Sequence, residues 1–428
     1  MAKALIVAAP HSGSGKTLVT LGLIRALRNT GLKVASAKAG PDYIDPQFHS
    51  AASGSPCLNL DYWAMGPDQC KNLLAESGKT SDIVIIEGVM GLFDGPDGAT
   101  GSTADLAAAL GLPVLLVIDS SHQAQSIAAL AKGFAQFSGD VNIAGVFLNR
   151  TKSPRHSQIL RNALAEIAMP VVGELRHDDS LHMPSRHLGL VQALENQQLE
   201  AFLESAARGV ARETKLDNVV NLSANFSNQK HAHATLLPPL AQNIAIARDE
   251  VFTFAYPHLL KNWREAGASL SFFSPLANEA PNPSAEAVFL PGGYPELHAG
   301  KIAGNRAFLQ SLQQFSGLIY GECGGYMVMG AGLVDTHGHH HAMAGLLPLE
   351  SSFEKPKLHL GYRQLTCTAG PFPAKLRGHE FHYATILSEG DGDRLFAAEN
   401  AAGDALPAMG LRRGRVMGSF AHIISVQP

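Results

Sequence analysis

The stretch Ala4-Leu-Ile-Val-Ala-Ala-Pro10-His-Ser-Gly-Ser-Gly-Lys-Thr17 joins a short apolar run to a glycine-rich loop that ends in Gly-Lys-Thr. The apolar run Ala4–Ala9 predicts a buried strand, and the residues after the loop, Thr17–Asn29, predict a helix. Strand, loop and helix in this order are typical of a phosphate-binding loop, although Pro10 stands where the first glycine is usual. The stretch therefore predicts an α/β domain that binds a nucleotide.

The loop residues suit ATP because backbone N–H groups and the start of the helix hold phosphate oxygens. The ammonium group of Lys16 would neutralise the β- and γ-phosphates, and the hydroxyl of Thr17 would bind Mg²⁺. Lys38, after the second predicted strand, is a further cation for the phosphates. Asn149, at the end of the fifth strand, could contact adenine or simply hold a turn. The expected ATP-binding residues are Ser12, Gly13, Ser14, Gly15, Lys16, Thr17 and Lys38.

Two loops with carboxylates follow the second and third predicted strands, at the sheet edge where such domains place their chemistry. They read Lys38-Ala-Gly-Pro-Asp-Tyr-Ile-Asp-Pro46 and Glu87-Gly-Val-Met-Gly-Leu-Phe-Asp-Gly95. Because Mg²⁺ prefers oxygen ligands, we expect Thr17, Asp42 and Glu87 to bind it. We expect Asp45 and Asp94 to position the substrate or to transfer protons during its activation, although a helix cap or turn is an alternative for each.

Both halves of the chain alternate strands and helices, which predicts an α/β fold throughout. In the first half the strands are continuous apolar runs, as in a parallel sheet that is covered on both faces. Their expected ranges are Ala4–Ala9, Val34–Ala37, Ile83–Glu87, Val114–Asp119, Ile143–Asn149 and Val171–Leu175. The expected domains are residues 1–195, which bind ATP, and residues 241–428. A linker over 196–240, which could be partly helical, is expected between them.

Composition excludes several classes of protein. Of the 428 residues, 46% are hydrophobic and 16% charged, so the chain is globular. A net charge of −4 gives no reason to expect a nucleic-acid or membrane partner. The four cysteines are not paired in Cys-x-x-Cys motifs, which favours reduced thiols and a cytoplasmic location. The sequence leaves the oligomeric state open, with a homodimer as one expectation.

The second half contains a cysteine in a glycine-flanked turn, Gly321-Glu-Cys-Gly-Gly325, directly after the apolar run Leu318–Tyr320. This is the arrangement of a nucleophile elbow, in which a sharp turn lifts the nucleophile above the sheet. Because the next helix begins at Cys323, we expect its dipole to lower the pKa of the thiol. Acyl transfer through a thioester is the chemistry that this arrangement favours, and a buried structural cysteine is the alternative.

A thiol nucleophile also needs a base and an oxyanion hole. The turn Pro291-Gly-Gly293 precedes the elbow in the chain, and we expect the N–H groups of Gly293 and Gly324 to face the oxyanion, with an ordinary turn as the alternative. His422, after the last strands, is the expected base. His379 and His382 are competing candidates.

The motifs described above, in their order along the chain, resemble those of the cobyrinic acid and hydrogenobyrinic acid a,c-diamide synthase family of cobalamin biosynthesis. The resemblance covers essentially the whole chain. The segments that carry the resemblance are residues 12–17, 38–46, 87–95, 290–298, 321–327 and 377–383. The resemblance implies a domain like dethiobiotin synthetase, followed by a class I glutamine amidotransferase domain with a flavodoxin-like fold.

The resemblance also implies an activity. Cys323, helped by His422, would release ammonia from glutamine, and ATP with Mg²⁺ would convert the a and c acetate side chains of a tetrapyrrole into acyl phosphates. Ammonia would then displace phosphate. Local similarity favours hydrogenobyrinic acid, the metal-free substrate, and cobyrinic acid is the alternative.

One departure from the family pattern concerns the base. Residue 424 is Ile, so the chain lacks both the second histidine of the usual His-x-His and the glutamate that commonly follows the base by two residues. The partner that orients His422 is therefore open. Two alternative functions also stay open. One is a P-loop switch ATPase with an inactive glutaminase domain, and the other is a thiol hydrolase whose nucleotide domain is regulatory.

Overall fold

The computed structural model describes residues 2–181, 185–186, 189–190, 193, 196–227, 235–367 and 369–428. The chain divides into two compact units, Met1–Ala234 and Thr235–Pro428. Within the described residues, no helix is both long enough and apolar enough to cross a membrane.

The first unit is built on a largely parallel sheet with the strand order β3-β2-β4-β1-β5-β6-β7, and β10 pairs antiparallel with β1. All six strands that the sequence predicts are present, and β3 and β10 are additional. Their bounds are β1 Lys3–Ala8, β2 Val34–Ala39, β3 Leu58–Leu60, β4 Ile83–Glu87, β5 Val114–Asp119, β6 Ile143–Thr151, β7 Val171–Arg176 and β10 Ala224–Asn225.

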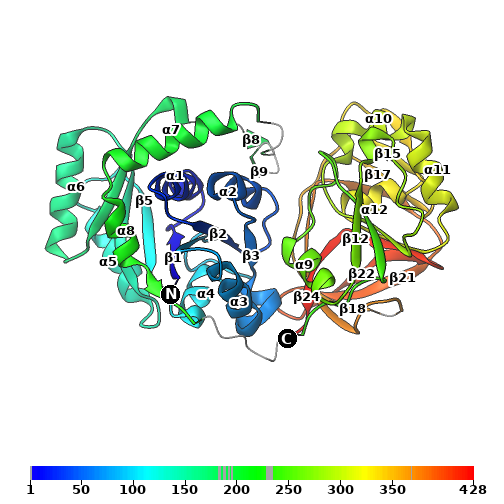
Figure 1. Cartoon of the computed structure of the whole chain (residues 1–428), viewed down its shortest axis with the longest axis horizontal. Coiled ribbons are helices and arrows are strands. Elements are labelled where there is room, and N and C mark those ends of the chain that lie inside the picture. The colour runs from blue at the N-terminus through cyan, green and yellow to red at the C-terminus, as the bar shows by residue number, and fades with distance from the viewer. Residues whose placement is uncertain are drawn as a thin grey trace. The chain divides into compact units, whose positions relative to one another are not determined.

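Helices cover both faces of this sheet, which explains why its central strands are apolar without alternation. Figure 1 shows α1, α2 and α7 on one side of the sheet and α3 and α4 on the other, while α5 and α6 pack together beside β6. The bounds are α1 Lys16–Asn29, α2 Asp45–Ser53, α3 Tyr62–Gly78, α4 Thr103–Leu110, α5 Ile127–Phe137, α6 Pro154–Glu166, α7 Leu199–Arg212 and α8 Leu216–Leu222.

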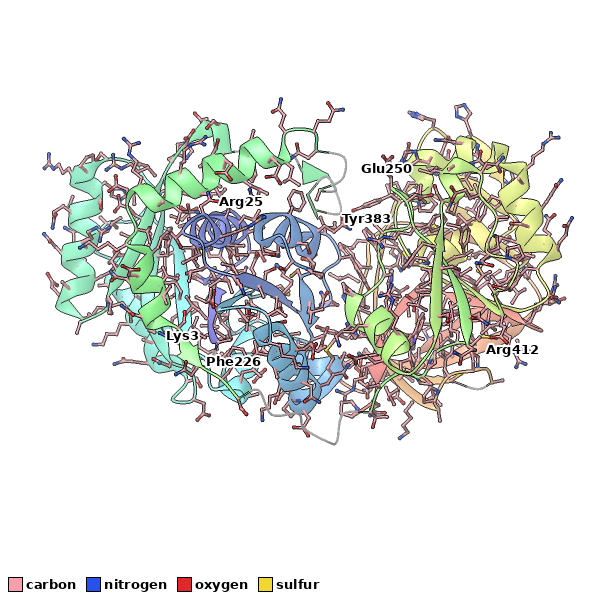
Figure 2. The ribbon with its side chains drawn as sticks, viewed as in Figure 1. Lys3, Arg25, Phe226, Glu250, Tyr383 and Arg412 are labelled. Carbon is pink, nitrogen blue, oxygen red and sulfur yellow. The ribbon has the colours of Figure 1, made fainter. Side chains whose placement is uncertain are left out.

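Part of the expected linker over 196–240 forms the helices α7 and α8, which lie in the first unit. Helix α7 packs along α1 through buried apolar side chains such as Leu203 and Val210. It is also held by Arg25 of α1, labelled in Figure 2, which forms ion pairs of 2.9 Å with Glu200 and Glu204. The helix belongs to the first unit because its apolar stripe needs α1 to cover it. Residues 228–234 of the expected linker lie outside the described residues.

The second unit contains a long mixed sheet with the strand order β12-β11-β13-β14-β23-β22-β21-β18-β19-β24. Neighbours from β12 to β23 run parallel, as expected of a flavodoxin-like sheet, and the later neighbours are antiparallel. The bounds are β11 Asn243–Ala247, β12 Ser269–Phe273, β13 Ala287–Leu290, β14 Leu318–Glu322, β18 His359–Cys367, β19 Lys375–His382, β21 Asp393–Glu399, β22 Ala405–Arg413, β23 Val416–Ser419 and β24 Ala421–Val426.

The described residues of this unit also form a second, four-stranded sheet and the α-helices α9 to α12. The sheet has the order β16-β15-β17-β20, with the bounds β15 Gly332–Val334, β16 His340–Ala342, β17 Leu349–Ser352 and β20 Thr385–Glu389. The helices are α9 Pro257–Glu265, α10 Ala299–Gly304, α11 Arg306–Gln314 and α12 Gly324–Met329. Only Phe420 separates β23 from β24, so the two ends of the antiparallel part meet at this residue.

Candidate functional sites

The phosphate-binding loop has the backbone that its glycines predict. Gly13 and Gly15 have φ angles of 83° and 82°, a left-handed conformation that favours glycine, and Gly15 caps helix α1. A Cβ atom on Gly15 would lie 2.1 Å from Nδ2 of Asn149, and this amide nitrogen donates to the carbonyl oxygen of Ser14 at 2.8 Å. Asn149 at the end of β6 therefore supports the loop from behind.

Glu87, at the end of β4, is the centre of a buried ion cluster and is 0% exposed. Its Oε1 atom accepts hydrogen bonds from the Thr17 hydroxyl at 2.7 Å and from Lys38 Nζ at 2.9 Å. Its Oε2 atom accepts from His49 Nε2 at 2.6 Å. Burial alone would raise the pKa of this carboxyl, but Lys38 and His49 hold it well below the ordinary value.

The cations of the cluster are held in their charged forms. Burial would lower the pKa of Lys38, but Asp45 at 2.6 Å and Glu87 raise it well above the ordinary value. Burial would likewise lower the pKa of His49, yet Glu87 raises it to about 10. Asp45 behaves differently, because burial and the nearby Asp42 raise its pKa to about 6.

The three expected Mg²⁺ ligands gather around Lys38. Thr17 and Glu87 are hydrogen-bonded to each other, and Oδ2 of Asp42 lies 3.7 Å from the Lys38 ammonium group. All three offer the oxygen donors that Mg²⁺ prefers, so the donor set fits this ion. Oδ1 of Asp42 is already used, because it accepts the backbone N–H groups of Ile44 and Asp45.

Lys16 and Asp94 lie in the same loop region but have different surroundings. The buried ammonium group of Lys16 donates to the carbonyl oxygen of Met90 at 2.9 Å, and burial lowers its pKa. Asp94 is exposed, and its carboxylate accepts the N–H of Gly91 at 2.9 Å, which stabilises the turn after β4. The structure thus brings Asp45 into the ion cluster, whereas Asp94 contacts Gly91 within its own loop.

A cavity of about 210 Å³ lies beside helix α1. It is lined by Leu18, Asn149, Arg150, Leu175, Arg176, His177, Asp178, Asp179 and Leu181. Most of these residues lie at or just after the ends of β6 and β7, at the same edge of the sheet as the phosphate-binding loop. Of this wall only Asn149 could be predicted from the sequence, because no motif marks the other residues.

In the second unit, Cys323 occupies the predicted elbow between β14 and α12. Its φ and ψ angles of 46° and −107° are unusual for a residue other than glycine. The cysteine is 3% exposed, and its backbone N–H donates to the carbonyl oxygen of Ser419 at 2.8 Å. This bond fixes the elbow to the end of β23.

The expected lowering of the Cys323 pKa is wrong. Burial raises the pKa of the thiol well above its ordinary value, and the carboxylates of Glu296, Glu380 and Glu322 raise it further. A hydrogen bond from the backbone N–H of Gly324 opposes this only in part. Helix α12 has six residues, too few to offset the burial. The thiol is therefore protonated at rest, and its activation requires a base.

His422 and Cys323 meet at Gly292, in the turn after β13. A Cβ atom on Gly292 would lie 3.0 Å from Nε2 of His422 and 3.2 Å from Cβ of Cys323. The imidazole edge and the cysteine thus border the same small space, which glycine leaves open. The structure therefore brings the predicted nucleophile and the predicted base together.

The two expected oxyanion donors are also neighbours. The backbone nitrogen of Gly293 lies 3.0 Å from the position that a Cβ atom on Gly324 would take. Gly293 has a φ of 155°, and a Cβ atom there would overlap the carbonyl oxygen of Val251 at 1.5 Å. Position 293 therefore accepts no side chain, and a glycine there lets the turn pack closely beside the elbow.

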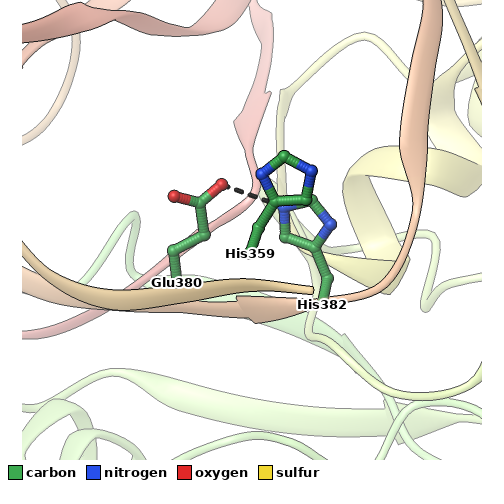
Figure 3. Close-up of side chains that lie close together, drawn as sticks. All are labelled: His359, Glu380 and His382. Carbon is green, nitrogen blue, oxygen red and sulfur yellow. Dashed lines mark hydrogen bonds and ion pairs between the residues drawn. The ribbon is translucent and has the colours of Figure 1, made fainter. Parts of the chain in front are cut away.

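The competing histidines have other partners. His379 pairs with His422 across β19 and β24, and burial, together with His422, lowers its pKa to about 3. Figure 3 shows His382 donating toward Glu380 while its ring lies over that of His359. The hydrogen bond from His382 Nε2 to Glu380 Oε1 is 2.9 Å long, and the ring centroids of the two histidines are 4.7 Å apart.

The cluster His359–Glu380–His382 brings three metal-binding residue types together, but its geometry does not suit a metal ion. The two imidazole planes differ by only 8°, so their lone pairs lie in parallel planes instead of converging on one point. Arg363 already places a cation 2.7 Å from the other oxygen of Glu380. The cluster is better described as a hydrogen-bonded wall near Cys323.

Sequence reasoning missed His49 and the surroundings of Glu322. His49 follows Asp45 by four residues on α2, a helical spacing that could have indicated a shared face. Glu322 stands inside the elbow motif, but its contacts come from the end of the chain, which no local pattern reveals.

Two family models match the chain. The CobQ/CobB/MinD/ParA nucleotide binding domain matches residues 5–191, and the CobB/CobQ-like glutamine amidotransferase domain matches residues 243–428. The chain is 52% identical, over 424 residues and 98% of each sequence, to a Rhizobium meliloti protein named hydrogenobyrinate a,c-diamide synthase. A Brucella abortus protein of the same name is 52% identical over 430 residues, which cover 99% of this chain and 98% of that protein.

Proposed function

We propose that this chain, which belongs to the hydrogenobyrinate a,c-diamide synthase family, uses ATP and glutamine to convert the a and c carboxylates of hydrogenobyrinic acid into amides. The observation that carries the proposal is the presence, in one chain, of a phosphate-binding loop and a cysteine elbow that faces a histidine. The choice of the metal-free tetrapyrrole over cobyrinic acid follows the names of these relatives.

In the proposed reaction the first unit activates the carboxylate. The loop at residues 12–17 holds the phosphates of ATP, while Lys16 and Lys38 offset their charge. Mg²⁺, held by Thr17, Asp42 and Glu87, would further neutralise the phosphates. The substrate carboxylate attacks the γ-phosphorus and releases ADP, and ammonia then displaces phosphate from the acyl phosphate. Asp45 is placed to take up a proton, since its pKa of about 6 is close to neutral pH.

The cavity beside α1 suits the nucleotide base in this proposal. Oδ1 of Asn149 is buried without a hydrogen-bond partner among the described residues, while its Nδ2 supports the loop. A free acceptor at this place matches the amino group of adenine.

The second unit provides the nitrogen. Cys323 transfers its proton to His422 and attacks the amide carbon of glutamine. The N–H groups of Gly293 and Gly324 stabilise the oxyanion, ammonia leaves with the proton from His422, and water then hydrolyses the thioester. Because the thiol is protonated at rest, the nucleophile forms by this proton transfer.

The test combines purified protein, ATP, Mg²⁺ and glutamine with hydrogenobyrinic acid or cobyrinic acid and measures product masses. The proposal predicts that hydrogenobyrinic acid gains two amides. A product without amides would contradict the function, and amidation of cobyrinic acid alone would correct the substrate. Cell fractionation and light scattering test the cytoplasmic location and the homodimer, which stay predictions.

A further inference from the structure

We propose that Glu322, the residue directly before Cys323, is the positioning carboxylate that orients His422 for proton transfer. The inference rests on the glutaminase step of the proposed function. Oε2 of Glu322 lies 3.6 Å from Nδ1 of His422, and the side chains are 3% and 1% exposed. A carboxylate and an imidazole that approach each other this closely away from water interact strongly.

The other oxygen of Glu322 is fixed by two hydrogen bonds. Oε1 accepts the hydroxyl of Tyr320 at 3.0 Å and the backbone N–H of Ile423 at 3.0 Å. Because Ile423 follows His422 in the chain, the carboxylate holds the backbone beside the imidazole as well as facing its ring. These bonds leave Oε2 as the oxygen that faces Nδ1.

The register of the sheet explains why these residues meet. Glu322 is the last residue of β14 and pairs with Ser419, the last residue of β23. The chain then turns at Phe420 and enters β24, where His422 is the second residue. The elbow and the histidine are thus both anchored at the same sheet position, with Glu322 between them.

The two ring nitrogens of His422 face different groups. Nδ1 is directed at Glu322, and Nε2 borders the space at Gly292 that Cys323 shares. If the carboxylate accepts the Nδ1 proton, Nε2 is left as the acceptor for the thiol proton, and the carboxylate then stabilises the imidazolium. The distance of 3.6 Å is longer than a hydrogen bond, and such contacts commonly shorten when substrate binds.

This arrangement accounts for the departure at residue 424. The carboxylate that commonly follows the base by two residues is replaced here by Ile424, which is buried. Glu322 reaches the same imidazole from the strand before the nucleophile. Of the titratable groups that face His422, β14 contributes Glu322, β19 contributes His379 and the elbow contributes Cys323. His379, whose pKa is about 3, is neutral near pH 7.

The test replaces Glu322 with glutamine, which keeps the shape and removes the charge. In Glu322→Gln we expect the kcat for glutamine hydrolysis to fall about 100-fold, while KM changes by less than about 3-fold. The acidic limb of the pH profile of kcat should move to lower pH by about 1 unit, because the imidazolium loses its counter-charge. Glu322→Asp should restore part of the rate.

Tyr320→Phe is the matched variant, since it removes one hydrogen bond to Oε1 and keeps the carboxylate. It should lower kcat by less than about 10-fold. Amidation with ammonium chloride in place of glutamine should be unchanged in each variant, because it does not use the site of Cys323. Unchanged fluorescence of Trp263 should show that the second unit is folded.

The outcomes separate this inference from the proposed function. A Glu322→Gln protein with a normal kcat and an unchanged pH profile of kcat would overturn the role of Glu322 alone. If the unchanged protein hydrolyses no glutamine, the proposed function and this inference both fall.

Discussion

The two buried sites of this chain treat charge in opposite ways. Around Glu87 in the first unit, the carboxylate, Lys38 and His49 all have pKa values moved toward their charged forms. Around Cys323 in the second unit, burial moves the pKa values of the thiol and of His379 toward their neutral forms. Glu87 and Cys323 are similarly buried, at 0% and 3% exposure, so burial alone does not explain the difference.

The difference comes from what each group contacts. Glu87 has cationic partners within hydrogen-bond distance on both oxygens, whereas the group that acts most strongly on the Cys323 thiol is the carboxylate of Glu296. A site that binds phosphates needs permanent charges, and these survive burial only as hydrogen-bonded pairs. A thiol that reacts by proton transfer can rest in the neutral form until substrate arrives.

The comparison predicts that the two sites can be inactivated separately. Cys323→Ala should lose glutamine hydrolysis and glutamine-dependent amidation by more than about 1,000-fold, because the nucleophile is gone, and should keep amidation with ammonium chloride. Lys16→Ala should lose amidation with either nitrogen source, because the phosphates lose a cation, and should keep some glutamine hydrolysis. Product masses and glutamate release measure both activities.

Two results would contradict this separation. Amidation from glutamine that persists in Cys323→Ala would show that another group releases the nitrogen. A Lys16→Ala protein with normal amidation would favour a thiol hydrolase whose nucleotide domain is only regulatory.

Breaking the charged cluster around Glu87 should strongly lower the free energy of unfolding. Glu87→Gln leaves Lys38 and His49 without their shared carboxylate, and we expect the free energy of unfolding to fall by about 3–5 kcal/mol. Urea unfolding followed by fluorescence of the buried Trp63 measures this in the first unit, in a Trp263→Phe background. As a control, Glu76→Gln removes a partly exposed ion pair with Lys79 and should cost no more than about 1 kcal/mol. Equal losses in the two variants would contradict the central role of Glu87.

The neutral histidines should make the second unit sensitive to acid. Burial lowers the folded pKa of His258 to about 4 and that of His379 to about 3, so the unfolded chain binds more protons below pH 6.5. Their contribution is present above pH 6.5 and is lost as the pH falls toward 4. Between pH 6.5 and 4.5, His258 alone should cost about 2 kcal/mol.

The contribution of His49 to stability depends on pH in the opposite direction, because its folded pKa is raised to about 10. This contribution is present below pH 6.5 and is lost as the pH rises through 10. Trp63 and Trp263, the two tryptophans of the chain, report one unit each. Unfolding followed by the fluorescence of Trp263, in a Trp63→Phe background, should show that the second unit loses stability as the pH falls from 6.5 to 4.5. In His258→Gln the free energy of unfolding should depend less on pH, and an equal dependence in this variant would rule out His258 as the source.

Local sequence patterns predicted the parts of both sites that lie next to a strand end. The phosphate-binding loop, Glu87 and the elbow each follow a continuous apolar strand, so their positions could be predicted from the chain itself. The resting state of Cys323 could not, because it depends on burial and on Glu296 and Glu380, which other elements bring near the thiol. The packing of α7 on the first unit could not be predicted for a similar reason, since only the folded chain brings α1 against its apolar stripe.

The central claim is that the nitrogen of the product amides passes through Cys323. The most direct measurement supplies glutamine labelled with ¹⁵N at the side-chain amide, together with ATP, Mg²⁺, hydrogenobyrinic acid and unlabelled ammonium chloride, and reads the isotope in the product. The account predicts ¹⁵N in the amides of most of the product in the unchanged protein and two unlabelled amides in Cys323→Ala. Labelled amides in Cys323→Ala, or product without ¹⁵N in the unchanged protein, would contradict it.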